Sequence, residues 1–270
     1  MFNKLGRSNP SKNCRVFSES PKNFYKLDPL TATYAEQHSA VEQKFDTGDR
    51  PSLLAIEDCL LEIKNEIENN YNYENLFEGT AIPFCMSIDN PSEDLGTKLE
   101  KFWLPLLKKE FERQCPGSYF KATLQGNFEL KQSLSIAKDT GYDTFLEAGS
   151  NSSIVGYYFP TALQEFDIES QRRKIAKFPK FINSSICLSG PFEIIYSLIC
   201  YPKLLHSKEN YSPILCASAL EHDDPRMVMI FKSYGPHLEF WLLSQMLTPT
   251  KTQVSEQWSG GLTVFKPLQK

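Results

Sequence analysis

The sequence lacks any apolar run approaching the roughly 20 residues that a transmembrane helix requires. Its first ten residues are polar and lack the apolar core of a secretory signal. These two absences predict a protein that does not insert into a membrane and that resides in the cytosol.

An excess of charge of one sign is missing as well. The 29 lysines and arginines nearly balance the 33 aspartates and glutamates, which gives a formal net charge of −4 and a pI of about 5.7. Binding of nucleic acid normally needs a basic face or stripe, so we expect no nucleic-acid partner. The seven cysteines are scattered without a C-x-x-C pair, which predicts free thiols rather than a zinc ribbon or a thioredoxin-like site.

The common catalytic motifs are also absent. The sequence contains no G-x-x-x-x-G-K or G-x-G-x-x-G phosphate loop, and no G-x-S-x-G or H-E-x-x-H motif. We therefore expect no cofactor and no metal ion, and we favour a binding protein over an enzyme.

Apolar residues are plentiful enough for a folded core, since 41% of the chain is hydrophobic and 13% is aromatic. Apolar residues recur at helical spacing from Leu53 to Ile67, behind the helix-start signal at Ser52, and predict an amphipathic helix. A second helix is expected over residues 94–111, with Pro105 as a kink or a break. Further helices are expected at residues 35–44, 128–136 and 161–177.

These patterns predict four regions. They are a poorly ordered lead-in at residues 1–50, a helix-rich domain of unknown family at 51–150, a repeat region at 160–250 and a C-terminal tail at 251–270. The glycine- and serine-rich stretch 141–156 marks the expected boundary in the middle of the chain. The tail is interpreted either as a short strand pair or as a segment docked by Trp258.

An internal repeat lies in the second half of the chain. Residues 193–202 align without a gap with residues 226–235, at an offset of 33 residues, which is the ankyrin period. Between them, Ser212-Pro213-Ile214-Leu215-Cys216-Ala217 resembles the ankyrin T-P-L-H-x-A signature, with Leu215 where histidine is usual. Residues 181–247, about a quarter of the chain, are therefore similar to degenerate ankyrin repeats.

This resemblance implies a mainly α fold, with a helical N-terminal domain followed by a short ankyrin-like stack of helix pairs. In ankyrin proteins the partner contacts the turn tips and the exposed face of the inner helices. The contact residues implied in this chain are Lys208, Asn210, Tyr211, His237 and Glu239, with Glu221 and His222 at the edge of the groove.

The segment 221–224 has two interpretations. His222 lies between carboxylates, an arrangement that suits a metal ligand or a general base. By the ankyrin resemblance, His222 instead ties a turn together and Asp224 caps a helix. We favour the structural interpretation.

The favoured function is protein–protein recognition, as an adaptor or as a bacterial effector that acts in the host cytosol. One alternative is an enzyme with its active site in the N-terminal domain and the repeats as a targeting module. A deep pocket lined by titratable residues within 50–150 would favour that alternative. A second alternative is an F-box-like ubiquitin ligase adaptor, because residues 101–111 weakly resemble the closing helix of an F-box domain. A structural or self-associating protein is a third.

Overall fold

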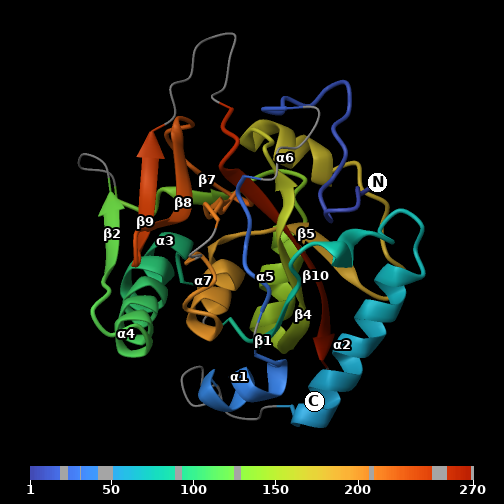
Figure 1. The fold of residues 1–270 in the computed structure, drawn as a ribbon, viewed down its shortest axis with the longest axis horizontal. Coiled ribbons are helices and arrows are strands. Elements are labelled where there is room, and N and C mark those ends of the chain that lie inside the picture. Colours follow the sequence, from blue (N-terminus) through green and yellow to red (C-terminus); the bar gives the residue numbers. More distant parts are fainter. Residues whose placement is uncertain are drawn as a thin grey trace.

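The computed structural model describes residues 1–18, 24–30, 32–41, 51–88, 93–124, 129–206, 210–244 and 254–268 (Figure 1). The helices are α1 (Tyr34–Val41), α2 (Leu53–Glu68), α3 (Leu95–Lys98), α4 (Leu104–Gln114), α5 (Tyr142–Asn151), α6 (Ile168–Ile175) and α7 (Pro191–Cys200). A 3-10 turn spans Leu76–Glu78, and a π-helical turn spans Leu99–Trp103. The strands are β1 (Ile82–Met86), β2 (Phe120–Leu124), β3 (Leu134–Ile136), β4 (Ser153–Gln164), β5 (Ser185–Leu188), β6 (Ile214–Cys216), β7 (Leu220–His222), β8 (Met227–Tyr234), β9 (His237–Ser244) and β10 (Trp258–Leu268).

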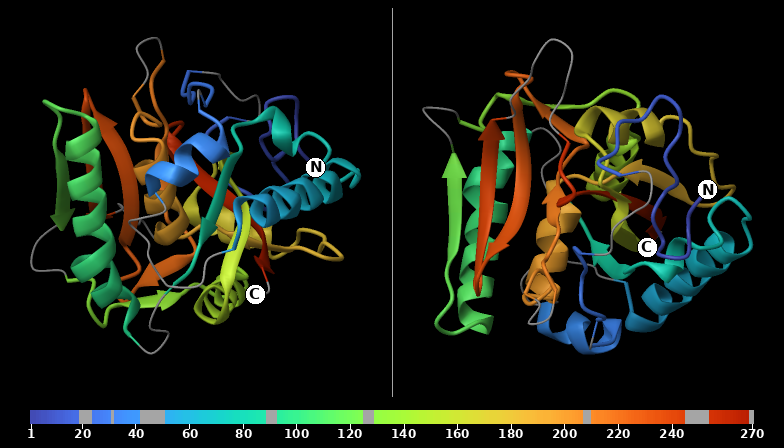
Figure 2. Two further views of the ribbon diagram at one scale, coloured as in Figure 1. Left: turned by 90° about the horizontal axis from the view of Figure 1, so that it is seen from below. Right: turned by 45° about the horizontal axis from the view of Figure 1, so that its top comes forward.

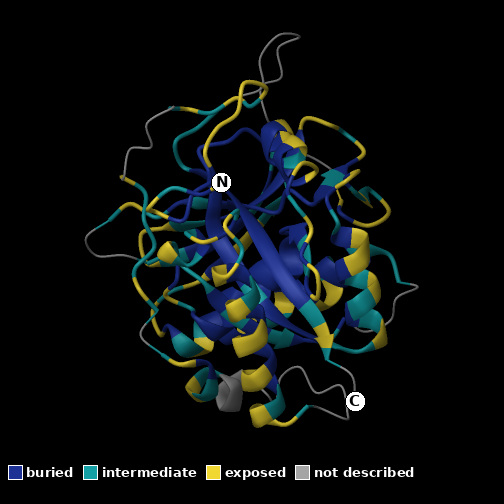
Figure 3. Cartoon of the chain, turned by 90° about the vertical axis from the view of Figure 1, so that its right-hand side faces the viewer, coloured by how far each residue is buried: buried dark blue, intermediate teal, exposed yellow. Residues whose placement is uncertain are grey.

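One large mixed sheet organises the molecule. Its strands follow the order β1-β4-β10-β6-β8-β9-β2, and β5 also pairs with β10. The C-terminal strand β10 lies in the interior of the sheet, antiparallel to β4 and β5 and parallel to β6. Figure 3 shows this strand as buried along most of its length, and it becomes exposed only near the C-terminus. A second, two-stranded sheet pairs β3 with β7.

Helices α2, α4, α5, α6 and α7 pack against this sheet, and α7 is fully buried (Figures 1 and 2). Every residue of α7 is buried, and the helix contacts α1, α4, β1 and β4. Helix α2 is amphipathic and packs against β4 and β10 through one apolar face. Sheet and helices therefore share one large apolar core, and a smaller apolar cluster lies apart from it.

Three of the helices expected outside the repeat region are present among the described residues. Helix α1 matches the one expected at 35–44, and α2 and the stretch from α3 to α4 match those expected at 53–67 and 94–111. Helix α2 begins after Ser52, whose hydroxyl accepts a hydrogen bond from the amide of Ala55 at 3.2 Å, as expected of an N-cap. The second helical stretch starts at α3 and continues through the π turn into α4. The interruption expected at Pro105 is this π turn, because proline cannot donate the usual backbone hydrogen bond within a helix.

The mainly α fold class is wrong, and so is the ankyrin resemblance. Helix and strand contribute nearly equally to the structure. Residues 193–200 lie in helix α7, but the residues aligned with them form strand β8. The T-P-L-H-like segment contains β6, and the expected third unit, residues 236–243, forms most of β9. No stack of helix pairs exists in this part of the described chain.

The physical reason lies in the burial of both faces of β8. Met227, Met229 and Phe231 pack into the main core, whereas Val228 and Ile230 pack into a second cluster on the other side. A strand buried on both faces shows no alternation of polar and apolar residues, so a short apolar run does not distinguish it from a buried helix. The turn at Gly235, with φ of 57°, closes a hairpin in which Tyr234 pairs with His237.

The expected joining helix at residues 161–177 is also wrong, because the segment divides between the end of β4, a turn and α6. Leu134 and Ile136, assigned to a helix, lie in β3, and Phe128 lies outside the described residues. Trp258 begins the long strand β10. The large sheet draws strands from both sides of residues 141–156, since β1 pairs with β4 and β2 pairs with β9.

Candidate functional site

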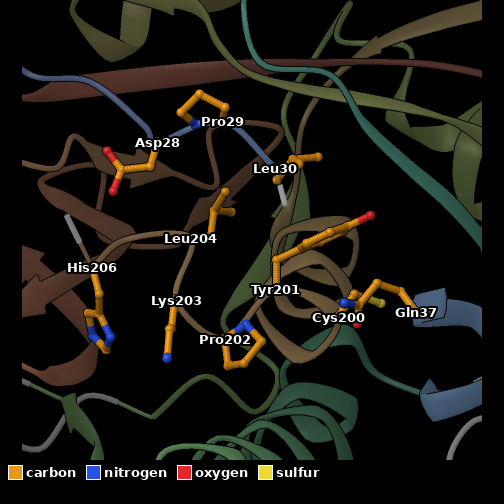
Figure 4. A pocket seen from close by; sticks show the side chains of 10 residues that line it. All are labelled: Asp28, Pro29, Leu30, Gln37, Cys200, Tyr201, Pro202, Lys203, Leu204 and His206. Carbon is orange, nitrogen blue, oxygen red and sulfur yellow. The ribbon is translucent and has the colours of Figure 1, made fainter. Parts of the chain in front are cut away.

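A cavity of about 580 Å³ lies where an N-terminal segment crosses the end of α7 (Figure 4). Residues far apart in the sequence form its walls: one group lies in the N-terminal segment and α1, and the other at the end of α7 and in the turn after it. The lining residues are Asp28, Pro29, Leu30, Gln37, Cys200, Tyr201, Pro202, Lys203, Leu204 and His206. The size falls within the range of pockets that hold small ligands or the side chains of a partner.

The end of α7 forms the floor of this cavity because the helix stops abruptly. The amide of Tyr201 donates to the carbonyl of Ser197 at 2.8 Å, and Pro202 cannot continue the helix. Two further backbone hydrogen bonds, from Leu204 to Tyr201 and from His206 to Lys203, turn the chain back across the helix end. The turn is therefore held by the backbone, which fixes the side chains that line the cavity.

His206 is a partly buried titratable side chain of this cavity. Its ring lies 5.5 Å from the ring of Phe111, and its Nε2 lies 3.4 Å from the carbonyl oxygen of His237. Burial lowers the pKa of His206, and the hydrogen bond to His237 opposes this only in part. At neutral pH we expect a neutral imidazole beside the exposed ammonium group of Lys203.

Tyr201 contributes a hydroxyl group that is unusual for a protein interior. The side chain is 7% exposed, and its hydroxyl oxygen has no hydrogen-bond partner among the described residues. Figure 4 shows its ring between Leu30 and the pair formed by Cys200 and Gln37. Burying an unpaired hydroxyl costs about 1–3 kcal/mol. The Tyr201 hydroxyl therefore lowers the free energy of unfolding of the protein.

Replacing Tyr201 by phenylalanine is therefore expected to raise the free energy of unfolding by about 1 kcal/mol. The matched control is Tyr142→Phe, which is expected to lower it by a similar amount because the Tyr142 hydroxyl donates to Glu193 at 2.8 Å. Urea denaturation of the three proteins measures both changes. Equal losses in the two variants would show that the Tyr201 hydroxyl has a partner in solution.

Two aromatic pairs lie next to residues of the cavity wall. In the first pair, Tyr211 is 71% exposed and lies 6.0 Å from the ring of Tyr25, and the Lys26 amide donates to the Tyr211 carbonyl. Next to it, the Asn210 side chain lies 3.4 Å from the carboxylate of Asp28 in the cavity wall. In the second pair, His237 stacks on Tyr119 with a centroid distance of 3.7 Å, and the His237 carbonyl contacts His206 of the cavity.

The structure distributes the residues predicted from the sequence over three places. Asn210, Tyr211 and His237 lie beside the cavity just described. Glu221 and His222 line a second cavity. Glu239 lies on β9, 7% exposed, where its carboxylate accepts a hydrogen bond from the indole of Trp241 at 2.8 Å and pairs with Lys232 at 3.5 Å. Lys208 lies outside the described residues.

The second cavity, of about 480 Å³, lies between α6, β7 and the start of β8. Arg172 dominates it: the guanidinium donates to the carbonyls of Ser218 and Leu220 and pairs with Glu221 at 3.3 Å and with Glu169 at 3.7 Å. Arg172 is therefore paired with acidic side chains of the same cavity, and these ion pairs stabilise the cavity walls.

His222 fixes a turn rather than facing a reactive group. Its Nδ1 accepts a hydrogen bond from the Asp224 amide at 2.9 Å, and its Nε2 lies 3.4 Å from the carbonyl of Glu129. Asp224 binds the guanidinium of Arg226, which lowers the pKa of that carboxyl to about 2.

Within the described ranges, no three histidine, cysteine or acidic side chains converge as metal ligands would, and no helix is long and apolar enough to cross a bilayer.

Sequence reasoning did not identify the residues that form the walls of the first cavity. Asp28 and Leu30 lie in the expected lead-in, and Lys203 and His206 follow a helix without any motif. The only local signal is the pair of prolines, Pro29 and Pro202, which mark the two places where the chain turns. Their meeting in space depends on long-range packing that no local pattern records.

Comparisons of the chain with protein-family models, with curated proteins and with solved structures find no match to any of the three. Its function is therefore inferred from its own residues.

Proposed function

We propose that this protein is a recognition protein that binds another protein at the cavity between the N-terminal segment and the end of α7. The observation that carries the proposal is the presence of exposed and half-buried aromatic side chains beside a concave, mostly apolar wall. Tyr211 follows Asn210, which contacts Asp28 of the cavity, and His237 with Tyr119 lies next to His206. Tyrosines at the edge of a pocket are frequent anchors of protein interfaces.

Pre-organisation supports this proposal. The hydroxyl of Tyr25, the ring partner of Tyr211, accepts a hydrogen bond from Gln257 at 2.9 Å, and its carbonyl accepts hydrogen bonds from Arg7 and Gln164. His237 is held from two directions, because its Nδ1 accepts from the Tyr119 amide and its carbonyl lies against His206. Side chains that are ordered before binding lose little conformational entropy when a partner arrives.

The lining of the cavity indicates what part of a partner would fit. Leu30, Leu204 and the two prolines offer an apolar wall, whereas Asp28 and His206 offer polar groups. A partner side chain with an apolar body and a hydrogen-bonding end matches this combination. We therefore expect one anchor residue of the partner to enter the cavity and the neighbouring partner surface to contact the aromatic pairs.

The test changes Tyr211 and His237 to alanine together in the full chain. We expect the double variant to bind its partner at least ten-fold more weakly, since each lost aromatic anchor typically costs more than about 1 kcal/mol. Affinity capture with quantitative mass spectrometry identifies the partner candidates, and titration calorimetry with the purified partner then gives the affinity.

The matched control is Tyr71→Ala, because Tyr71 is 80% exposed and lies in the turn after α2, away from the cavity lining. Proteins captured by the wild type and by Tyr71→Ala, but lost with the double variant, support the proposal. Equal affinity of all three proteins for the purified partner, beside equal melting curves, would place the binding surface elsewhere. The full chain is required because residues 160–270 share their sheet with β1 and β2.

The enzyme alternative receives less support from the two cavities. Residues 50–150 were the expected location of its active site, but they contribute only Ser135 to the second cavity and no residue to the first. The segment with the F-box likeness forms part of the helix beside α7, where Trp103 packs on Phe192 at 5.2 Å. Recognition remains the function that the arrangement of the described residues favours.

A further inference from the structure

Strand β2 forms one end of the large sheet and has a free edge. In the strand order, β1 and β2 stand at the two ends. The residues of β1 are buried or half-buried, and a backbone hydrogen bond joins Cys85 to the Tyr196 hydroxyl of α7. Figures 1 and 2 show no described segment beyond β2, where Lys121 and Ala122 are exposed. The edge of β2 is therefore open to another strand.

The pairing with β9 decides which backbone groups of β2 face this edge. The two strands are parallel, and the amide of Leu238 donates to the carbonyl of Tyr119 at 3.1 Å. In a parallel pair, every second residue of a strand turns both its amide and its carbonyl toward the neighbouring strand. This register turns the backbone groups of Lys121 toward β9. The groups that face outward are therefore those of Phe120, Ala122 and Leu124.

Most of these outward groups have no partner among the described residues. The Phe120 amide donates to the carboxylate of Glu112 in α4 at 3.2 Å. The amides of Ala122 and Leu124 make no hydrogen bond with another described residue. A row of unpaired amides and carbonyls at a sheet edge is a template to which a further strand adds.

A second copy of the same strand fits this edge. Antiparallel pairing centred on Ala122 brings Phe120 opposite Leu124 of the second copy, and Lys121 opposite its Thr123. Each outward amide then meets an outward carbonyl, because the outward residues alternate in step on both copies. No like charges lie directly opposite each other, and the smallest side chain of the strand lies on the two-fold axis. The edge is therefore self-complementary, as a symmetric dimer requires.

Helix α4 carries a charge pattern that matches the same symmetry. Glu112 lies on the flank of α4 beside the edge, since its carboxylate contacts the Phe120 amide, and it pairs with Lys108 one turn away at 3.0 Å. A two-fold axis through Ala122, perpendicular to the sheet, sets the α4 helices of the two copies antiparallel on the same face. Lys108 of one copy then lies toward Glu112 of the other, so the two flanks attract each other.

We propose that this protein forms a two-fold symmetric dimer in which β2 pairs antiparallel with β2 of a second copy and continues the sheet across the interface. The strand edge sets the register, and the α4 flanks supply charge complementarity. Because β2 has five residues, we expect a weak dimer that forms in proportion to protein concentration. The binding cavity takes no part in this interface, so the inference is independent of the proposed function.

Sedimentation velocity of the full chain, from about 1 to 500 µM, measures the dimer. We expect the wild type to shift from monomer to dimer over this range, and hydrogen exchange of residues 120–124 to slow as the dimer forms. Ala122→Pro removes an outward amide and none that reaches β9, so it is expected to weaken dimerisation by about ten-fold or more. The matched control, Ala122→Ser, keeps the amide and is expected to dimerise like the wild type.

A charge reversal tests the same interface without touching the strand. Lys108→Glu is expected to weaken the dimer about three-fold, because like charges then face each other, and adding Glu112→Lys is expected to restore it. A wild type that stays monomeric would overturn the inference and leave the edge to a strand of a different protein. Equal dimerisation of Ala122→Pro and the wild type would also overturn it, as would a loss that Glu112→Lys does not restore, or slowed exchange that spares residues 120–124.

Discussion

Alanine in place of Gly156 is expected to lower the free energy of unfolding by about 3 kcal/mol or more and the melting temperature by roughly 10 °C. Gly156 lies in β4, between Phe84 of β1 and Phe265 of β10. A Cβ atom at this position would lie 2.2 Å from the carbonyl oxygen of Val264 and 2.9 Å from the Cα of Phe265. Both atoms belong to the backbone of β10, so no side-chain rotation relieves the clash.

The control for this prediction is Gly235→Ala in the β8–β9 hairpin. Gly235 has a φ of 57°, and an added Cβ would meet no atom within 4 Å. Alanine at this position therefore costs only the strain of the left-handed backbone, about 1 kcal/mol. Chemical denaturation under one set of conditions compares the free energies of unfolding of the two variants. Equal losses would mean that β4 and β10 can separate enough to admit a methyl group, and that the centre of the sheet is less tightly packed than the structure indicates.

Local sequence signals predicted helices well where one face of the helix meets water. The apolar spacing from Leu53 to Ile67 and the cap at Ser52 locate α2. Residues 193–200 were also assigned correctly to a helix, although α7 is buried on every side and the assignment rested on a repeat that does not exist. A capping box begins this helix, because the Gly190 amide donates to the Glu193 carboxyl group at 2.8 Å.

The sheet could not be predicted by the same reasoning. Strands β4, β8 and β10 are buried on both faces for most of their length, so they lack the two-residue alternation that marks a half-exposed strand. The pairing of β10 with β4 joins residues about 100 positions apart, and nothing in a single sequence records it. An offset of 33 residues between two apolar runs was therefore a coincidence of length and composition.

The candidate site likewise contains residues that the sequence analysis named and residues that it could not find. Tyr211 and His237 were chosen for exposure at turn tips, and the structure places both beside the cavity, but for another reason. Each is anchored to a segment distant in sequence, Tyr25 in one case and Tyr119 in the other. Asp28 and His206 could not be found at all, because their roles arise only when the N-terminal segment lies across the end of α7.

The second large effect concerns stability against pH, and Glu193 is its source. The wild type is expected to be less stable at pH 8 than at pH 5 by roughly 3 kcal/mol through this group alone. The folded pKa, about 7, lies above the unfolded value of 4.5, so the folded state binds the proton more tightly. Stability from this group is thus fully present below about pH 4.5 and falls until the pH passes the folded pKa.

Other titratable groups also contribute to the pH dependence of stability, but in other pH ranges or with the opposite sign. The carboxyl groups of Glu66 and Asp94 have lowered pKa values, because backbone and side-chain hydrogen bonds outweigh their partial burial, and they lose their stabilising effect only below about pH 4.5. His206 has a lowered pKa, so its contribution rises with pH up to about 6.5, opposite in sign to that of Glu193. The total pH curve of the wild type therefore mixes two opposing effects near neutral pH.

Comparing the free energies of unfolding of the wild type and of Glu193→Gln separates the contribution of Glu193 from that of His206. Glu193→Gln keeps an acceptor for the Gly190 amide but has no proton to lose. Subtracting its free energy of unfolding from that of the wild type at each pH, by urea denaturation between pH 5 and 8, cancels His206 and every other shared group. The difference should become more unfavourable to the wild type as the pH rises and level off above about pH 7. A flat difference would mean that Glu193 is ionised at pH 5 inside the fold, because the hydrogen bonds from the Gly190 amide and from the hydroxyls of Tyr142 and Thr263 then outweigh the cost of burying the charge.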